Sequence, residues 1–156
     1  MHRLIDVKIG LRCKHNHFRH TWNEMYSACT NNKRPAGQSI RQFITMAVEF
    51  CSGLSMHHSI EENYLFPKLA KKMPGFGKGE DLLKQHQAIH AGMDKLEAYL
   101  AGCQRGETDF SLVKVKKLMD SFGAVLWAHL DEEVRTLGAE NMRRYWTVGE
   151  LRRLRI

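Results

Sequence analysis

The chain has 156 residues, of which 43% are hydrophobic and 26% charged, and its formal net charge at pH 7 is +7. This length is typical of one globular domain and allows a full core without disulfide bonds. No apolar run approaches the ~20 residues that a membrane-spanning helix needs, and the first residues lack the apolar segment of a secretory signal. We therefore expect a cytoplasmic protein that does not interact with membranes.

The positive charge is concentrated between Arg143 and Arg155, near the C-terminus. A nucleic-acid interface would interleave such arginines with aromatic or polar base-reading residues, and few are present here. We therefore expect a solvated basic end and no nucleic-acid partner. The cysteines form no Cys-x-x-Cys pair, which excludes a zinc ribbon and a dithiol redox motif, and we expect reduced thiols that mostly face the core. They are Cys13, Cys29, Cys51 and Cys103.

The first long helix is predicted over residues 4–30, because apolar side chains recur there every three to four residues. Projection of this apolar face places His15 near it, and His17 and His20 away from it. His15 is therefore the candidate ligand on this helix, and the alternative is that all three histidines lie on the surface. The Pro, Gly and Asn residues of segment 31–38 predict a loop.

A capping box at residues 39–42 predicts the start of the second helix. Its apolar face continues into His57 and Glu61, which lie one turn apart on the same side. Polar groups on a buried face cost several kcal/mol unless they are paired or ligated, so this pair needs a metal ion or, alternatively, a buried ion pair. His58 and Glu62 are turned about 100° away, and we expect them beside the ligands or on the surface.

The third helix is predicted over residues 80–103, and His86 and His90 interrupt its apolar face one turn apart. Two neutral imidazoles on one face suit iron, copper or zinc. A zinc metalloprotease motif requires a glutamate directly after the first histidine, where this chain has Gln87. The metalloprotease interpretation is therefore excluded.

The fourth helix ends near residue 137 and carries His129 and Glu133, which repeat the His-x-x-x-Glu step of the second helix. Beyond it, a second capping box at residues 147–150 predicts short helical segments that pack on the bundle. We expect a four-helix bundle over residues 1–138 and a helical tail over residues 139–156.

The four helices together present more inward-facing ligands than one tetrahedral zinc ion needs. Imidazole and carboxylate without thiolate favour iron or manganese over copper(I) or structural zinc, and this number of ligands fits two ions that share carboxylates. The pattern predicts an all-α fold, an up-down-up-down four-helix bundle with a metal centre inside it. The candidate ligands are His15, His57, Glu61, His86, His90, His129 and Glu133.

The segment from His57 to Pro67, together with His15, the pair His86 and His90, and the segment from His129 to Glu133, resembles the hemerythrin-like, or HHE cation-binding, domains. The similarity extends over most of the chain, and the tail is similar to that of fungal members. The resemblance implies a four-helix bundle around two non-haem iron ions joined by an oxo or hydroxo bridge.

The resemblance also implies a role for each ligand. It implies further that one coordination position on the second iron stays open for dioxygen or a peroxide. Oxygen-carrying hemerythrins have an aspartate where this chain has Val134, so the longer Glu133 side chain must replace it. This departure does not fit a reversible oxygen carrier. The implied ligands are His86, His90 and His129 for one iron, His15 and His57 for the other, and Glu61 and Glu133 as bridges.

Three functions follow from these expectations. The first is a di-iron protein that binds or reacts with dioxygen, peroxide or nitric oxide, and the ligand set favours it. The second is an oxidoreductase that uses the same centre on a small organic substrate, which requires a pocket beside the open iron. The third is an iron sensor or store, in which metal binding folds the bundle. The sequence leaves open whether the protein is an enzyme, and its oligomeric state.

Overall fold

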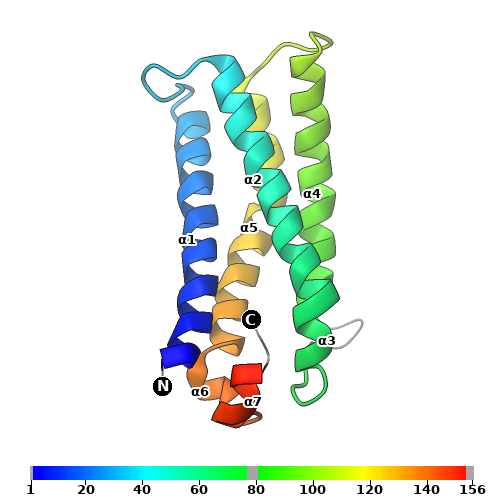
Figure 1. The fold of residues 1–156 in the computed structure, drawn as a ribbon. Coiled ribbons are helices and arrows are strands. Elements are labelled where there is room, and N and C mark those ends of the chain that lie inside the picture. The colour runs from blue at the N-terminus through cyan, green and yellow to red at the C-terminus, as the bar shows by residue number, and fades with distance from the viewer. Residues whose placement is uncertain (1, 77–80, 154–156) are drawn as a thin grey trace.

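The computed structural model describes residues 2–76 and 81–153, and the side chains of residues 14–76, 81–151 and 153. The described residues form helices and no strand, which confirms the all-α fold. Helix α2 packs against α1 and α4, and α5 packs against the same two helices from the other side. Four long helices run alternately up and down the molecule (Figure 1): α1 (His2–Thr30), α2 (Ile40–Ile60), α4 (Asp81–Gln104) and α5 (Leu112–Thr136).

Side-chain caps begin the helices where the sequence predicts them. The Gln42 amide donates to Ser39 Oγ at 3.1 Å and the Ser39 amide donates to Gln42 Oε1 at 2.8 Å, which is the expected capping box of α2. Thr147 and Glu150 form the second box, at the start of α7 (Val148–Arg153). These caps satisfy amides that have no partner within their own helix. The predicted first residue of the third helix, 80, lies outside the described residues.

The second helix is not a continuous α-helix. After α2, residues Glu61–Leu65 form one π-helical turn, η1, and Phe66–Leu69 form the short helix α3. The Phe66 amide donates to the Glu61 carbonyl, five residues earlier. Pro67 has no amide hydrogen to donate and its ring crowds the carbonyl four residues before it, so a wider turn ahead of it is favoured. The π turn begins at Glu61, one of the candidate ligands.

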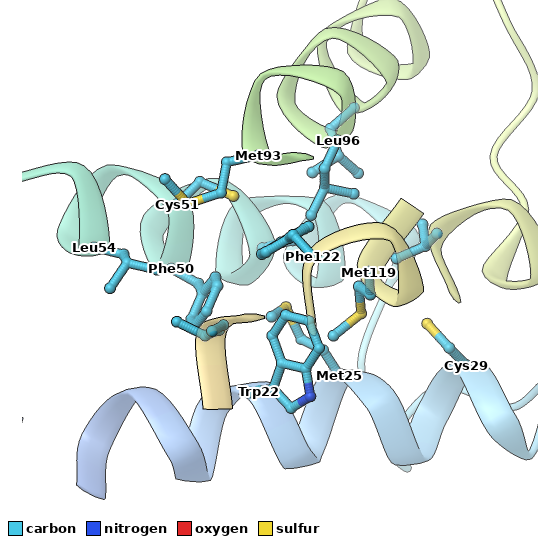
Figure 2. Close-up of a cluster of buried hydrophobic side chains, with 14 of the residues drawn as sticks. Trp22, Met25, Cys29, Phe50, Cys51, Leu54, Met93, Leu96, Met119 and Phe122 are labelled. Carbon is cyan, nitrogen blue, oxygen red and sulfur yellow. The ribbon is translucent and has the colours of Figure 1, made fainter. Parts of the chain in front are cut away.

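The core consists of two apolar clusters, one above the other along the bundle. The larger fills the space between the four long helices, and Figure 2 shows it around Trp22, Phe50 and Phe122. Close packing here requires glycine, because a Cβ on Gly92 would lie 2.5 Å from Phe122 and one on Gly123 would lie 2.8 Å from the Trp22 ring. The four long helices are therefore closely packed in this part of the bundle.

The smaller cluster closes the lower end of the bundle. It joins residues of η1, α3 and the start of α4 to the chain after α5, including Leu137, Met142 in α6 (Ala139–Met142) and Leu151 in α7. The tail thus packs on the bundle, while the boundary between bundle and tail stays a prediction. Arg143, Arg144 and Arg153 are exposed, and the remaining basic residues of the tail lie outside the described side chains.

Cys29 and Cys51 are buried and Cys103 is half-buried, and all three are free thiols, as expected. The side chain of Cys13 lies outside the described residues. Among the described helices, none is long and apolar enough to cross a membrane.

Candidate metal centre

Seven buried polar side chains lie at one level of the bundle, between the two apolar clusters. From α2 into η1, for example, Leu54 belongs to the larger cluster and Leu65 to the smaller one, and three of the polar residues lie between them. An isolated buried charge costs several kcal/mol, so such a layer requires partners of its own. The seven residues, each at most 6% exposed, are His15, His57, His58, Glu61, His86, His129 and Glu133.

One group of these side chains gathers between α2, α4 and α5. Its potential ligand atoms, one each from His58, Glu61, His86 and His129, all lie within 4.8 Å of one another. The Nε2 atoms of His86 and His129 are 3.2 Å apart, and His86 Nε2 lies 3.5 Å from Glu61 Oε2. The His58 ring stacks on the His86 ring at a centroid distance of 3.8 Å. Three imidazoles and a carboxylate thus face one point.

A second group gathers beside it, between α1, α2 and α5, and consists of His15, His57, Glu61 and Glu133. The Nε2 atoms of His15 and His57 are 3.2 Å apart, and Glu61 Oε1 lies 3.0 Å from His57 Nε2. Glu133 Oε2 lies 3.1 Å from His15 Nε2 and also 3.6 Å from His129 Nε2 in the first group. Glu61 belongs to both groups and Glu133 contacts both, as bridging carboxylates would.

The donor atoms fit metal ions better than they fit one another. All four carboxylate oxygens of Glu61 and Glu133, and the Nε2 atom of His58, are buried without a hydrogen-bond partner. Two imidazole nitrogens at right angles around an ion about 2.1 Å away would lie about 3 Å apart, close to the observed 3.2 Å between paired Nε2 atoms. Orphaned buried acceptors are rare in folded proteins unless a ligand satisfies them.

Hydrogen bonds outside the two groups orient the imidazoles. His86 Nδ1 donates to Glu62 Oε1 at 2.7 Å, and His129 Nδ1 donates to Gln85 Oε1 at 3.0 Å. Each bond places the ring proton on Nδ1 and leaves the Nε2 lone pair facing the centre, an arrangement that is general among metal-binding histidines. His58 Nδ1 lies 3.2 Å from His90 Nε2.

A layer of histidines and glutamates from four antiparallel helices is the arrangement that the sequence resemblance implies. The family described as the hemerythrin HHE cation-binding domain matches residues 11–139 of this chain. The chain belongs to this family. The matched segment includes every member of both groups, so cation binding by this hemerythrin domain agrees with the geometry.

Two curated proteins are similar to this hemerythrin domain. The dimeric xanthone biosynthesis cluster protein R11 of Cryptosporiopsis sp. is 30% identical over 146 residues, which cover 87% of this chain and 53% of that protein. A phosphate acetyltransferase of Mycoplasma capricolum is 30% identical over 98 residues, which cover 63% of this chain and 28% of that protein. The chain thus spans about half the length of the first relative and less of the second. No solved structure matches the chain.

The structure brings six of the seven predicted ligands together, and the exception is His90. Its half-buried side chain lies beside His58 and belongs to neither group. On α4, His90 lies one turn beyond His86, directly after Ile89 of the larger apolar cluster, so it lies toward that cluster. His58 takes the place that was predicted for His90. Its side chain is fully buried inside the first group, whereas the sequence predicted it beside the ligands or on the surface. As ligands, these residues remain a proposal.

The cause of this difference is that α2 has two neighbours in the bundle. A helix that packs on both α1 and α4 buries a face wider than the 100° between consecutive residues, so His57 faces α1 while His58 faces α4. The signal in the sequence is the doubled pattern His-His-x-x-Glu-Glu, which supplies one histidine for each neighbour. Glu62 lies at the edge, 40% exposed, as expected.

A groove of about 530 Å³ lies between α1 and α2, and His57 is among its lining residues. Phe18 and Phe50 are among its apolar lining residues. His17 and His20 line it from α1 and are exposed, in agreement with their predicted position off the inner face. His57 thus belongs both to the lining of the groove and to the second group.

Burial favours the neutral form of four of these histidines. It lowers the pKa of His57 and of His129 to about 4, and lowers the pKa of His58 and His86 as well. Neutral imidazole is the form that binds metals. Burial, and then the charge of the neighbouring Glu133, raises the pKa of Glu61 well above its usual range, so the metal-free protein holds a proton on this carboxyl at neutral pH.

Metal affinity is therefore expected to fall with decreasing pH. Between pH 8 and pH 6, His57 and His129 of the folded protein are already neutral, whereas Glu61 must lose its proton to bind a cation. Each proton released weakens binding about tenfold per unit of decreasing pH. Calorimetry in two buffers of different ionisation enthalpy counts this proton. Affinity that does not change with pH would contradict a protonated Glu61.

Proposed function

We propose that this hemerythrin domain holds two non-haem iron ions and reacts with dioxygen, or with peroxide or nitric oxide, at a position left open on one iron. The observation that carries the proposal is the orientation of Glu61, whose two oxygens face different imidazole groups, at 3.0 Å from His57 Nε2 and 3.5 Å from His86 Nε2. A carboxylate that spans two ligand groups is what two neighbouring ions require.

The donor set favours iron. Both groups consist of imidazole and carboxylate, and within the described part of the chain neither contains a cysteine. This composition suits iron or manganese rather than copper(I) or structural zinc. Bound iron would supply an open coordination position for a small oxidant and electrons to reduce it.

The residues divide unequally between the two ions. The first group offers three imidazoles, from His58, His86 and His129, whereas the second offers two, from His15 and His57, in addition to the carboxylates. With Glu61 and Glu133 bridging, the first ion would have five protein ligands and the second four, so we assign the open position to the second ion. The apolar clusters above and below the layer keep water from the site, which strengthens electrostatic interactions inside it.

The test is to load the metal-free protein with ferrous iron in the absence of oxygen, count the iron, admit air, record the visible spectrum, and flush with argon. We expect about two irons per chain and a ferric spectrum that persists under argon, since Val134 departs from the pattern of oxygen carriers. A band that disappears under argon would instead identify a reversible carrier. Failure to retain iron would contradict the proposal and favour another metal.

The groove supports a second candidate function, oxidation of a small organic molecule. Its volume of about 530 Å³ lies in the range of small-molecule sites, and it combines aromatic lining from Phe18 and Phe50 with charged side chains at Lys14, Glu24 and Glu49. The similar protein from Cryptosporiopsis bears the name of a biosynthesis cluster for dimeric xanthones, which are aromatic compounds. An aromatic substrate in this groove would lie against the His57 ring.

Gly53→Leu is expected to close the groove without disturbing the fold. A Cβ on Gly53 lies 3.6 Å from Phe18, an ordinary contact, and replacing a glycine inside a helix gains up to about 1 kcal/mol. With anilinonaphthalenesulfonate, an aromatic anion, as the probe, we expect fluorescence titration to show binding about tenfold weaker or worse. Ser52→Leu places the same side chain outside the groove and should bind the probe normally. Equal affinities in the two variants would remove the support for this candidate.

A further inference from the structure

Helix α1 carries two oxidisable rings, Trp22 and Tyr26, between the metal centre and the surface. We propose that they form an electron route, by which Tyr26 supplies an electron through Trp22 to the centre while its phenol proton passes to Asp120. The inference rests on the proposed function, since it needs a metal centre that reacts with dioxygen. It adds a role for residues that contact no ligand atom.

A continuous series of ring contacts leads from the centre into the core. The His57 ring lies 5.4 Å from the Phe18 ring, between centroids, and Phe18 lies 6.1 Å from Phe50. Phe50 in turn lies 5.9 Å from Trp22, and Figure 2 shows the indole extending from α1 toward it. Phenyl rings resist oxidation, so Phe18 and Phe50 are not oxidised themselves. They fill the space that the electron crosses between the indole and His57.

Trp22 is followed, one helical turn later, by Tyr26. The two rings stack with a centroid distance of 6.1 Å and an interplanar angle of 14°. Trp22 is 4% exposed, whereas Tyr26 is half-buried and reaches the surface. Indole and phenol are among the most readily oxidised side chains. The pair therefore provides two side chains that can each lose one electron, a buried one in Trp22 and one at the surface in Tyr26.

The hydrogen bonds of Tyr26 distinguish it from a tyrosine that serves packing alone. Its hydroxyl donates to Asp120 Oδ1 at 2.8 Å, and Lys116 Nζ donates to the same hydroxyl at 3.0 Å and to Asp120 Oδ2 at 2.9 Å. A phenol that loses an electron becomes a strong acid, and a carboxylate at hydrogen-bond distance accepts its proton without a large movement. Lys116 holds Asp120 in the ionised form that can accept it.

Reduction of dioxygen to two waters takes four electrons and four protons, and two bound ferrous ions would supply two of the electrons. Tyr26 supplies the third through Trp22, becomes a neutral phenoxyl radical, and gives its proton to Asp120. A further ferrous ion in solution supplies the fourth by becoming ferric, and solvent supplies the protons consumed.

Tyr64 provides a matched control. It lies three residues after Glu61 and is thus nearer in sequence to the centre, yet its side chain is 66% exposed. Among the described residues it stacks on no other ring, whereas Tyr26 stacks on Trp22. A radical that forms by diffusion of oxidants would favour the exposed Tyr64, and one that follows the ring contacts would favour Tyr26.

The experiment mixes the ferrous-loaded protein, with a small excess of ferrous iron, with oxygenated buffer, freezes it within milliseconds to seconds, and records electron paramagnetic resonance spectra. We expect a tyrosyl radical in the original protein and in Tyr64→Phe, and none in Tyr26→Phe. Asp120→Asn, which changes an exposed side chain, should lower the radical yield about tenfold or more. Iron content and the rate of iron oxidation should stay unchanged in all three variants.

The outcomes separate the two proposals. A radical that persists in Tyr26→Phe or disappears in Tyr64→Phe would overturn the electron route, as would normal iron oxidation with no tyrosyl radical in the original protein. Absence of iron binding, or of iron oxidation by air, would overturn the proposed function and the route with it. Because Tyr26→Phe removes one oxygen atom from a half-buried ring, we expect the variant to fold normally.

Discussion

Glu61→Gln is expected to abolish binding of both metal ions while the bundle stays folded. Glu61 is the one residue that belongs to both ligand groups, and its oxygens face His57 and His86. Glutamine keeps the shape but not the charge. Because Glu61 is protonated in the metal-free protein, a neutral amide should leave the unfolding temperature of that form nearly unchanged.

The measurement is metal content per chain after dialysis, together with thermal unfolding in the presence and absence of ferrous iron. In the original protein, free metal at 100 times its dissociation constant should stabilise the fold by about 2.7 kcal/mol per site, and Glu61→Gln should lose this gain. Glu62→Gln is the control, since its amide oxygen still accepts from His86 Nδ1 and metal should be retained. Normal metal content in Glu61→Gln would contradict the bridging role.

His58→Ala is expected to remove one metal ion, and His90→Ala to remove none. The Nε2 atom of His58 is buried without a partner and faces His86, Glu61 and the rest of the first group. His90 contacts His58 Nδ1 and acts on the centre through that ring alone. Loss of such an outer contact typically weakens metal binding 10- to 100-fold, or about 1.4–2.7 kcal/mol, without removing the site.

Counting the metal bound at saturating ferrous iron distinguishes a ligand, the role proposed for His58, from an outer contact, the role proposed for His90. Titration at low iron concentration measures the weaker affinity expected for His90→Ala. His17→Ala serves as a control for loss of a surface histidine, because His17 is exposed in the groove outside both groups. If His90→Ala lost one ion and His58→Ala kept two, the ligand set implied by the family resemblance would stand and the assignment from the geometry would be wrong.

Local signals in the sequence determined the helices and most of the centre. The recurrence of apolar residues predicts four amphipathic segments, and the capping box at Ser39 and Gln42 begins α2 where expected. His57 and Glu61 interrupt an apolar face one turn apart, as do His129 and Glu133, which is visible without a structure because residues four apart share a helix face. The sequence also determined the family, through these same motifs.

Only the tertiary structure shows which helices cover each face of a given helix and at which level along the bundle axis a side chain lies. Helical periodicity gives the direction of a side chain around its own helix axis, but not how many helices cover that face. From the sequence we therefore expected His58 at the edge of the centre or on the surface. In the structure α2 packs against both α1 and α4, and His58 is buried. Nor does periodicity say that His90, one turn from His86, lies beyond the layer. The ring contacts that join His57 to Tyr26 arise between α1 and α2, segments whose side-chain packing no local pattern specifies.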